Sequence, residues 1–189
     1  MNNAPIEYEV KFFSIDLADI RDRLERAGAT LKEPERLMRR CIFAQEANPL
    51  MTCTYIRIRD EGDKVTFSAK QHATDGKMES QKEYESTVND FETVRQILLS
   101  AGLTQTGLQE NKRETWQMPD GTLVELETWP QLPNYLEIEG HSERAVKDAA
   151  STLKLNWAEH IVESNDYLYA KQFGVERQKV FEKIANLTF

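Results

Sequence analysis

Charged residues recur at every second position in several separate stretches of this chain. Side chains of a β-strand alternate between its two faces, so these residues would share one face of each strand. Carboxylates gathered in this way bind hard divalent cations, and clustered arginine and lysine bind phosphate. The clearest stretches carry Glu7, Glu9 and Lys11 near the N-terminus, Arg57 and Arg59 in the middle, and Glu137 and Glu139 further on.

If the charged faces of the strands converge, acids and bases line one cavity. Unpaired charges are too costly to bury in a dry core, so such a wall requires water, ions or a charged ligand. Both signs together suit a polyphosphate chelated to Mg²⁺ or Mn²⁺, and hence phosphoryl or nucleotidyl transfer. The predicted wall also contains Lys70, Glu83, Glu85, Arg113, Glu125 and Glu127.

Arg39 and Arg40 are adjacent and therefore lie in opposite phases of a predicted strand. At most one of them can enter the cavity, and Arg39 is the slightly preferred choice.

Turn and helix signals bound the strands that must carry these residues. Gly62 predicts a tight hairpin, and Asp16 caps a helix that ends at Gly28. A second helix begins after Asn89 or Asp90 and ends at Gly102. Strands are predicted at about 6–12, 31–44, 54–59, 64–70, 77–88, 108–117, 123–129 and 135–140.

From Ser142 the hydrophobic period becomes helical, with a capping-box start and shorter helices after residue 155. The sequence therefore predicts an α+β fold. Its centre would be a closed or nearly closed antiparallel β-barrel of about eight strands with a charged tunnel and flanking helices. The 189 residues are expected to form one domain, with the barrel at about 5–140 and C-terminal helices at about 142–187.

Composition narrows the classes of partner. A net charge of −8 argues against nucleic acid, which requires a basic face. No signal peptide or apolar run long enough to span a bilayer is evident, so a cytoplasmic protein without a membrane partner is expected. Cys41 and Cys53 have neither a disulfide framework nor metal-ligand spacing. A homodimer is left open.

The ordered motifs resemble the CYTH, or triphosphate tunnel metalloenzyme, superfamily, which includes class IV adenylyl cyclases, thiamine triphosphatases and inorganic triphosphatases. The motifs are Glu7-x-Glu9-x-Lys11, Arg57-x-Arg59, Lys70, Arg113 and Tyr135–Gly140. The resemblance implies a barrel that binds a triphosphate and a divalent metal. It implies metal binding by Glu7, Glu9, Glu137 and Glu139, and phosphate binding by Lys11, Arg57, Arg59, Lys70 and Arg113. Strand phase adds Arg39 to the expected phosphate-binding residues.

Two positions depart from the family pattern. Asn111 stands where relatives carry a lysine, which removes one phosphate-binding charge. Glu127 stands where relatives usually carry aspartate, and its extra methylene should shift the geometry at the metal or nucleophile. Glu127 and Lys11 are the expected catalytic residues, with Glu83, Glu85 and Glu125 as additional candidates.

The leading hypothesis is a Mg²⁺- or Mn²⁺-dependent triphosphatase acting on tripolyphosphate, a nucleoside triphosphate such as ATP, or thiamine triphosphate. One alternative is an adenylyl cyclase that makes cyclic AMP and pyrophosphate from ATP. A third hypothesis is a non-catalytic sensor of polyphosphate or nucleotide. Asn111 favours hydrolysis modestly, and the reaction products distinguish the two enzymes.

Overall fold

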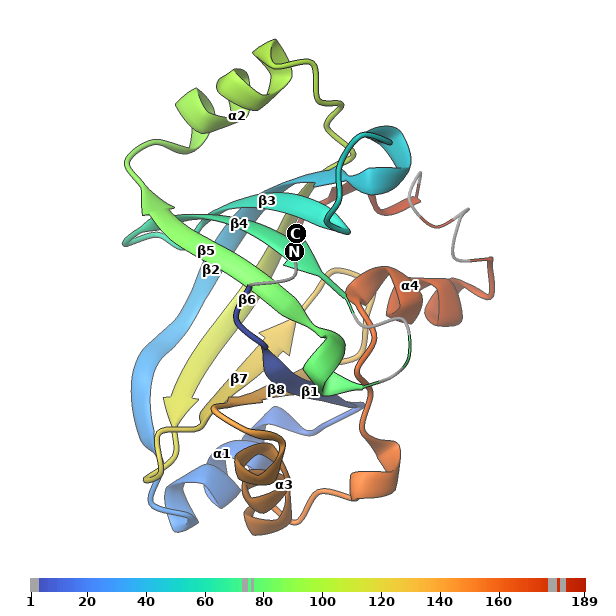
Figure 1. Ribbon diagram of the computed structural model, residues 1–189. Helices are drawn as coiled ribbons and strands as arrows, with labels where there is room; N and C mark the ends of the chain where they lie inside the picture. Colours follow the sequence, from blue (N-terminus) through green and yellow to red (C-terminus); the bar gives the residue numbers. More distant parts are fainter. Residues whose placement is uncertain (1–3, 73–74, 76, 177–179, 181–182) are drawn as a thin grey trace.

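The strands of the chain form one curled sheet, shown in Figure 1 for a computed structural model that describes residues 4–72, 75, 77–176, 180 and 183–189. Hydrogen bonds join the strands in the order β1-β8-β7-β6-β2-β3-β4-β5, and neighbours along this path are antiparallel. The strands are β1 (Tyr8–Phe13), β2 (Thr30–Ala44), β3 (Tyr55–Asp60), β4 (Val65–Gln71), β5 (Lys82–Val88), β6 (Gly107–Gln117), β7 (Leu123–Thr128) and β8 (Tyr135–Gly140).

The sheet is an open half-barrel, which corrects the expectation of a closed or nearly closed barrel. Its terminal strands, β1 and β5, share no ladder in the described residues. They approach each other at a bridge between Ile6 and Lys82. The Glu7 amide donates to the Gln81 carbonyl at 3.1 Å, and the Glu83 amide donates to the Pro5 carbonyl at 3.3 Å. We call this approach the seam.

Helices begin where the sequence places their caps. The Asp16 carboxylate accepts from the amides of Ala18 and Asp19 at the start of α1 (Leu17–Arg26). Asp90 caps α2 (Phe91–Ser100), and Ser142 caps α3 (Glu143–Thr152). These side chains satisfy amides that have no partner within the first turn of a helix. None of the described helices is long and apolar enough to cross a membrane.

The C-terminal segment differs from the expected run of helices to residue 187. After α4 (Asn165–Phe173), Asn186–Leu187 forms a short strand, β9, which pairs with β6 in parallel. Residues 177–179 and 181–182 of the expected last helix lie outside the described residues. Tyr169 of α4 packs with Trp129 and Tyr135 in an apolar cluster next to the end of β7.

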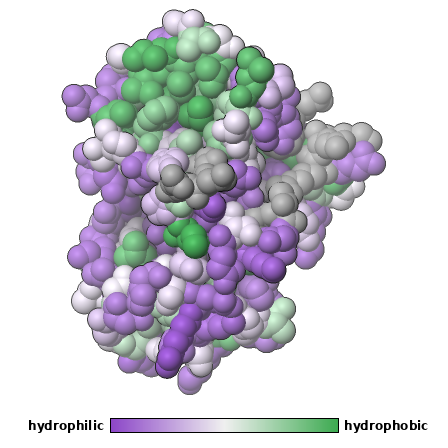
Figure 2. Space-filling view, in the orientation of Figure 1, coloured by the Kyte–Doolittle hydropathy of each residue, from purple (hydrophilic) through white to green (hydrophobic). Residues whose placement is uncertain are grey.

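Apolar residues face the helices on the outside of the sheet. Val10 and Ile138 belong to a buried cluster with Leu24 of α1 and Val146 of α3. Elsewhere on the outside of the sheet, side chains of β2 and β3 pack against α2. Figure 2 shows apolar atoms gathered at that end of the molecule. Because apolar positions point outward, the alternate, charged positions point to the inside of the curl.

Strand β2 contains two irregularities where it pairs with β6. The register shifts by one residue between Leu31 and Glu33 and again between Glu33 and Arg36. A β-bulge adds a residue to one strand and reverses which of its side chains face inward. The first bulge therefore turns Glu33 to the inside of the curl, and the second restores the phase so that Arg36 also points there.

Candidate active site

The inside of the curled sheet encloses a cavity of about 670 Å³. Predicted site residues on seven strands, or directly beside them, meet in this one cavity, because alternation places their side chains on the same face. The predicted residues that line it are Glu7, Glu9, Lys11, Arg57, Arg59, Lys70, Glu83, Glu85, Arg113, Glu125, Glu137 and Glu139.

Lys70 of β4 stands at the seam among three carboxylates. Its Nζ lies 2.7 Å from Glu7 and 3.2 Å from Glu9, and Glu83 of β5 lies 3.8 Å away. We call these four residues the Lys70 cluster. Burial raises the pKa of Glu7 well above its usual value, and the neighbouring charge of Glu9 adds to this effect. The cluster is therefore crowded with acids that one ammonium does not neutralise.

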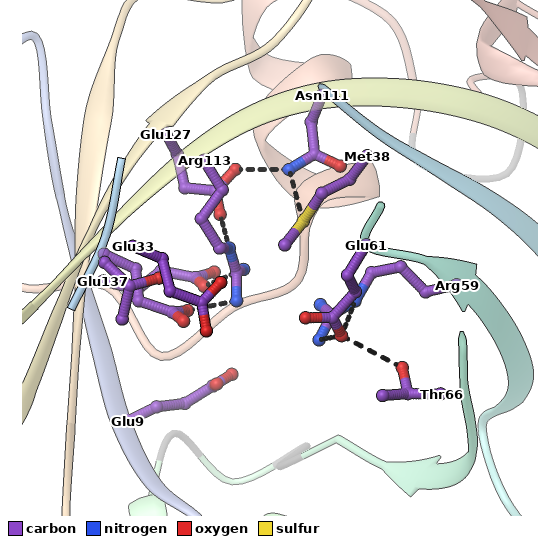
Figure 3. A network of polar contacts seen from close by, with 12 residues as sticks. Glu9, Glu33, Met38, Arg59, Glu61, Thr66, Asn111, Arg113, Glu127 and Glu137 are labelled. Atoms are coloured by element: carbon purple, nitrogen blue, oxygen red, sulfur yellow. Dashed lines mark hydrogen bonds and ion pairs between the residues drawn. The ribbon is translucent and has the colours of Figure 1, made fainter. Parts of the chain in front are cut away.

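A second cluster surrounds Arg113 of β6. Its guanidinium pairs with Glu125 and Glu127 of β7 and with Glu137 of β8, the last at 2.9 Å. We call these four residues the Arg113 cluster. Figure 3 shows three of them, Arg113, Glu127 and Glu137, facing Arg59 and Glu61 across open space. Oxygen atoms of the cluster's three carboxylates lie within 4.8 Å of one another, close enough to share a metal ion.

Lys11 connects the two clusters. Its Nζ lies 3.1 Å from Glu137 of the Arg113 cluster and 3.3 Å from Glu9 of the Lys70 cluster. Burial opposes the charge on Lys11, but Glu137 and Glu9 outweigh this effect and raise its pKa above the usual range. Lys11 is therefore a permanent cation at the centre of the site.

Glu127 is fully buried and does not line the cavity. It accepts hydrogen bonds from Asn111 Nδ2 at 2.9 Å, from Trp129 Nε1 at 2.7 Å and from the Arg113 guanidinium. Burial raises its pKa to about 7, although Arg113 acts in the opposite direction. This placement, behind Arg113, fits a residue that orients the arginine better than one that contacts a ligand.

Carboxylates stand directly opposite each other in two neighbouring ladders. Glu9 of β1 pairs with Glu139 of β8, and Glu125 of β7 pairs with Glu137 of β8. Like charges in such positions are destabilising. Glu139 has no ion pair among the described residues, and burial, with the charges of Glu125 and Glu9, raises its pKa to about 7. A divalent cation between these carboxylates would relieve the repulsion.

Arg57 and Arg59 of β3 form the opposite wall. Arg57 lies 3.1 Å from both Glu83 and Glu85. Arg59 lies 2.7 Å from Glu61, which is buried and also accepts a hydrogen bond from Thr66. Sequence reasoning placed Glu61 in a turn and missed it. The alternation of 57 and 59 continues to 61, and that signal could have found it.

The preference for Arg39 is wrong. Arg39 is exposed and its guanidinium lies over Phe91 of α2, 4.7 Å from the ring centre. Arg40 lines the cavity instead, because its register places it opposite Arg59 and Gln109, which face inward. Its guanidinium lies 4.2 Å from the Trp129 ring centre, and its Nε donates to Gln109 at 2.9 Å.

Arg36 and His72 also line the cavity and were not predicted to do so. Arg36 pairs with Glu33 at 2.6 Å, and the two bulges of β2 that bring them together leave no clear sequence signal. His72 is only 8% exposed and follows Lys70 by two residues. Extending the alternation of β4 by one step would have placed it on the cavity side.

Comparison with known protein families gives a match over most of the chain. The model of the CYTH domain family matches residues 5–167. A search of curated proteins found no match.

Several solved structures share the fold. The PH1012 protein of Pyrococcus horikoshii OT3 is 20% identical with a TM-score of 0.72, and the match covers 86% of this chain and 98% of that one. A candidate adenylate cyclase of Vibrio parahaemolyticus is 10% identical with a TM-score of 0.72, covering 92% and 100%. HpAC1 of Hippeastrum, a candidate adenylyl cyclase with a dominant triphosphatase activity, is 13% identical with a TM-score of 0.57, covering 94% and 95%.

Proposed function

The chain belongs to the CYTH domain family, and from that premise we propose that it is a divalent-metal-dependent hydrolase of triphosphate compounds. The observation that carries the proposal is the division of one cavity between opposed carboxylates and buried cations. Carboxylate pairs that repel each other suit a hard cation, and the cations beside them suit a phosphate chain.

Mg²⁺ or Mn²⁺ would be held by the carboxylates that meet across β1 and β8, namely Glu9 and Glu139, with Glu7 and Glu137 beside them. All are oxygen ligands, which these cations prefer. When bound, the metal supplies Lewis acidity and lowers the pKa of water. A bound cation would favour ionised Glu139, whose pKa of about 7 leaves it partly protonated at neutral pH without one.

The phosphates would be held by the cations on the surrounding walls. In the structure Lys11, Lys70 and Arg113 are each paired with two or more carboxylates. If the metal bound the carboxylates, the oxygen atoms of a substrate phosphate would replace them as partners of these lysine and arginine side chains. The phosphate-binding residues we propose are Lys11, Arg40, Arg57, Arg59, Lys70 and Arg113.

Two residues have defined parts in the chemistry we propose. Lys11 lies between Glu9 and Glu137 and stays protonated, so it can stabilise charge that develops on the transferred phosphoryl group. Glu127 is a positioning residue: it fixes the Arg113 guanidinium and is itself fixed by Asn111 and Trp129.

Phosphate release from tripolyphosphate, ATP and thiamine triphosphate, each with Mg²⁺ or Mn²⁺, tests the proposal. Glu9→Gln should lower kcat/KM by at least about a hundredfold, because it removes a metal ligand and a partner of Lys11 and Lys70. Glu25→Gln, on the exposed face of α1, is the matched control. Equal rates for Glu9→Gln and wild type, or no turnover of any substrate, would refute the proposal.

The same reactions distinguish the alternative activities. If the products were cyclic AMP and pyrophosphate instead of orthophosphate, the protein would be an adenylyl cyclase and not a hydrolase. If the protein bound a triphosphate tightly in the presence of metal but formed no product, it would be a sensor and not an enzyme.

A further inference from the structure

Helices cover the outer face of the sheet unevenly. Both α1 and α3 pack on the side of β1 and β8, where Val10, Ile138 and Val146 are 0% exposed. In the described part of the chain, α2 is the one helix that packs outside β3 and β4. There Phe67 of β4 is half-buried, and Tyr84 of β5 is 48% exposed. The second half of the sheet therefore leaves more apolar surface in water than the first.

The outward side chains of β4 and β5 form the uncovered part. They face each other in three ladder pairs, Val65–Val88, Phe67–Ser86 and Ala69–Tyr84. We call these six residues the bare strip. None of them is charged, and each is half-buried or exposed. An antiparallel sheet normally carries polar residues on a face that meets water, so the composition of the bare strip is typical of a covered face.

Beside the bare strip, α2 carries an apolar side chain that does not pack on its own sheet. Val94 and Leu98 of this helix belong to the same apolar cluster as Phe67. Ile97 follows Val94 by three residues and so lies on the same flank of the helix, but it is 58% exposed. Figure 2 shows apolar atoms gathered over α2 and the strands next to it. The helix and the bare strip thus form one apolar patch.

A second copy of the chain has the surface that fits this patch. A two-fold axis makes every contact occur twice, so a helix beside a strip on one copy can meet a strip beside a helix on the other. Each α2 would then lie across β4 and β5 of the other copy. That half of the sheet would gain a second helix, as the half under α1 and α3 already has.

Charge permits this contact although the chain carries −8. Two acidic copies repel each other where unpaired carboxylates meet, but the bare strip contains none. Glu92 on the exposed side of α2 pairs with Arg95 at 2.7 Å, and Arg39 adds a basic group over the ring of Phe91. We infer that the protein forms a two-fold dimer in which α2 of each copy packs across β4 and β5 of the other. The inference concerns the outer face and is independent of the reaction in the cavity.

Sedimentation velocity over a range of concentrations tests the dimer. Wild type should pass from one chain to two with a dissociation constant of about 10 μM or lower. Ile97→Glu should weaken association at least about tenfold, because it places a charge against an uncharged strip. Tyr84→Lys should do the same from the other side of the contact, and either variant serves if the other does not fold. A wild type that stays monomeric up to about 100 μM would overturn the inference and leave the patch to a different protein.

Mixing the two variants tests the reciprocal packing. A dimer of one Ile97→Glu chain and one Tyr84→Lys chain joins opposite charges in one half of the contact and keeps the wild-type contact in the other. The mixture should therefore associate at least about fivefold more tightly than either variant alone. Leu31→Glu, at a residue of β2 that is also 48% exposed but lies outside the patch, is the matched control and should leave association unchanged. A mixture no tighter than the separate variants would contradict the packing of α2 on the bare strip.

Discussion

The Lys70 and Arg113 clusters contain the same chemistry, one buried cation among three carboxylates, but the backbone supports them differently. Arg113 and its partners stand on β6, β7 and β8, which are joined by continuous ladders. Lys70 draws its partners from β1 and β5, which meet in the described residues at a single bridge.

This difference separates two uses of an ion pair. In the Arg113 cluster the ladders fix the strands, so the fold does not depend on its ion pairs to join them. At the seam the ion pairs of Lys70 join the two edges of the sheet, beside the backbone hydrogen bonds of Glu7 and Glu83. Charges of the Lys70 cluster therefore serve the fold and the site together.

The largest expected effect comes from removing each cation. Lys70→Met should lower the free energy of unfolding by about 3–5 kcal/mol, because buried carboxylates lose their counter-charge. It should also expose the amides of Glu7 and Glu83 at the seam to hydrogen exchange. Arg113→Met should leave those two amides protected. Protection of both amides in Lys70→Met would show that the seam does not depend on the ion pairs.

Glu83 of the Lys70 cluster and Glu127 of the Arg113 cluster should respond to pH in opposite directions. Burial opposes ionisation of Glu83, but Arg57 and Lys70 outweigh it and lower its pKa from 4.5 to about 2. Its stabilising contribution is present above pH 4.5 and lost as the pH falls through about 2. Burial raises the pKa of Glu127 from 4.5 to about 7, so its contribution is present below pH 4.5 and lost as the pH rises through about 7.

Each shift corresponds to roughly 3 kcal/mol, at about 1.4 kcal/mol per pKa unit. Denaturant unfolding across the acid and neutral range should therefore show the loss of stability at low pH reduced by about that amount in Glu83→Gln. The loss of stability toward neutral pH should be reduced by about the same amount in Glu127→Gln. The predicted contrast between Glu83 and Glu127 is wrong if both variants reduce the loss of stability on the same side of the pH profile.

A smaller effect is expected behind Arg113. Asn111→Leu removes one of the donors that Glu127 accepts from, which should cost about 1–3 kcal/mol of stability and raise the pKa of Glu127 further. Denaturant unfolding measures the first change, and the pH dependence of stability measures the second. An unaltered pH profile would mean that Asn111 does not support the carboxylate.

The smallest effect is expected at the outer rim of the seam. The side chain of Glu85 is 42% exposed, so solvent screens its pair with Arg57. Glu85→Gln should change the free energy of unfolding by less than about 1 kcal/mol. A loss as large as that in Lys70→Met would show that rim charges, rather than Lys70, hold the edges together.

Alternation predicted most of the cavity wall because it is a local property of each strand. Glu9, Arg59 and Glu137 all reach the cavity from strands far apart in the sequence. Alternation alone does not say how deep a residue lies. Glu125 and Glu127 share a phase, yet Glu125 lines the cavity and Glu127 lies behind Arg113.

Features that depend on pairing between strands could not be read from the sequence. The choice between Arg39 and Arg40 depends on the register of β2 against β3 and β6. Openness of the sheet depends on how the edges β1 and β5 approach, and no local pattern encodes that distance. The buried Nδ1 of His72, which has no hydrogen-bond partner among the described residues, is likewise a property of the assembled cavity.

The paired bulges of β2 make this strand a place where the site can change by insertion or deletion. Loss of one residue between Leu31 and Arg36 would remove one bulge and exchange which side chains there meet the cavity, while the partner strand β6 kept its register. Other strands of the wall would need coordinated substitutions for the same result. Comparisons among homologues should therefore allow single-residue gaps in this segment, because an ungapped alignment would equate residues on opposite faces of the sheet.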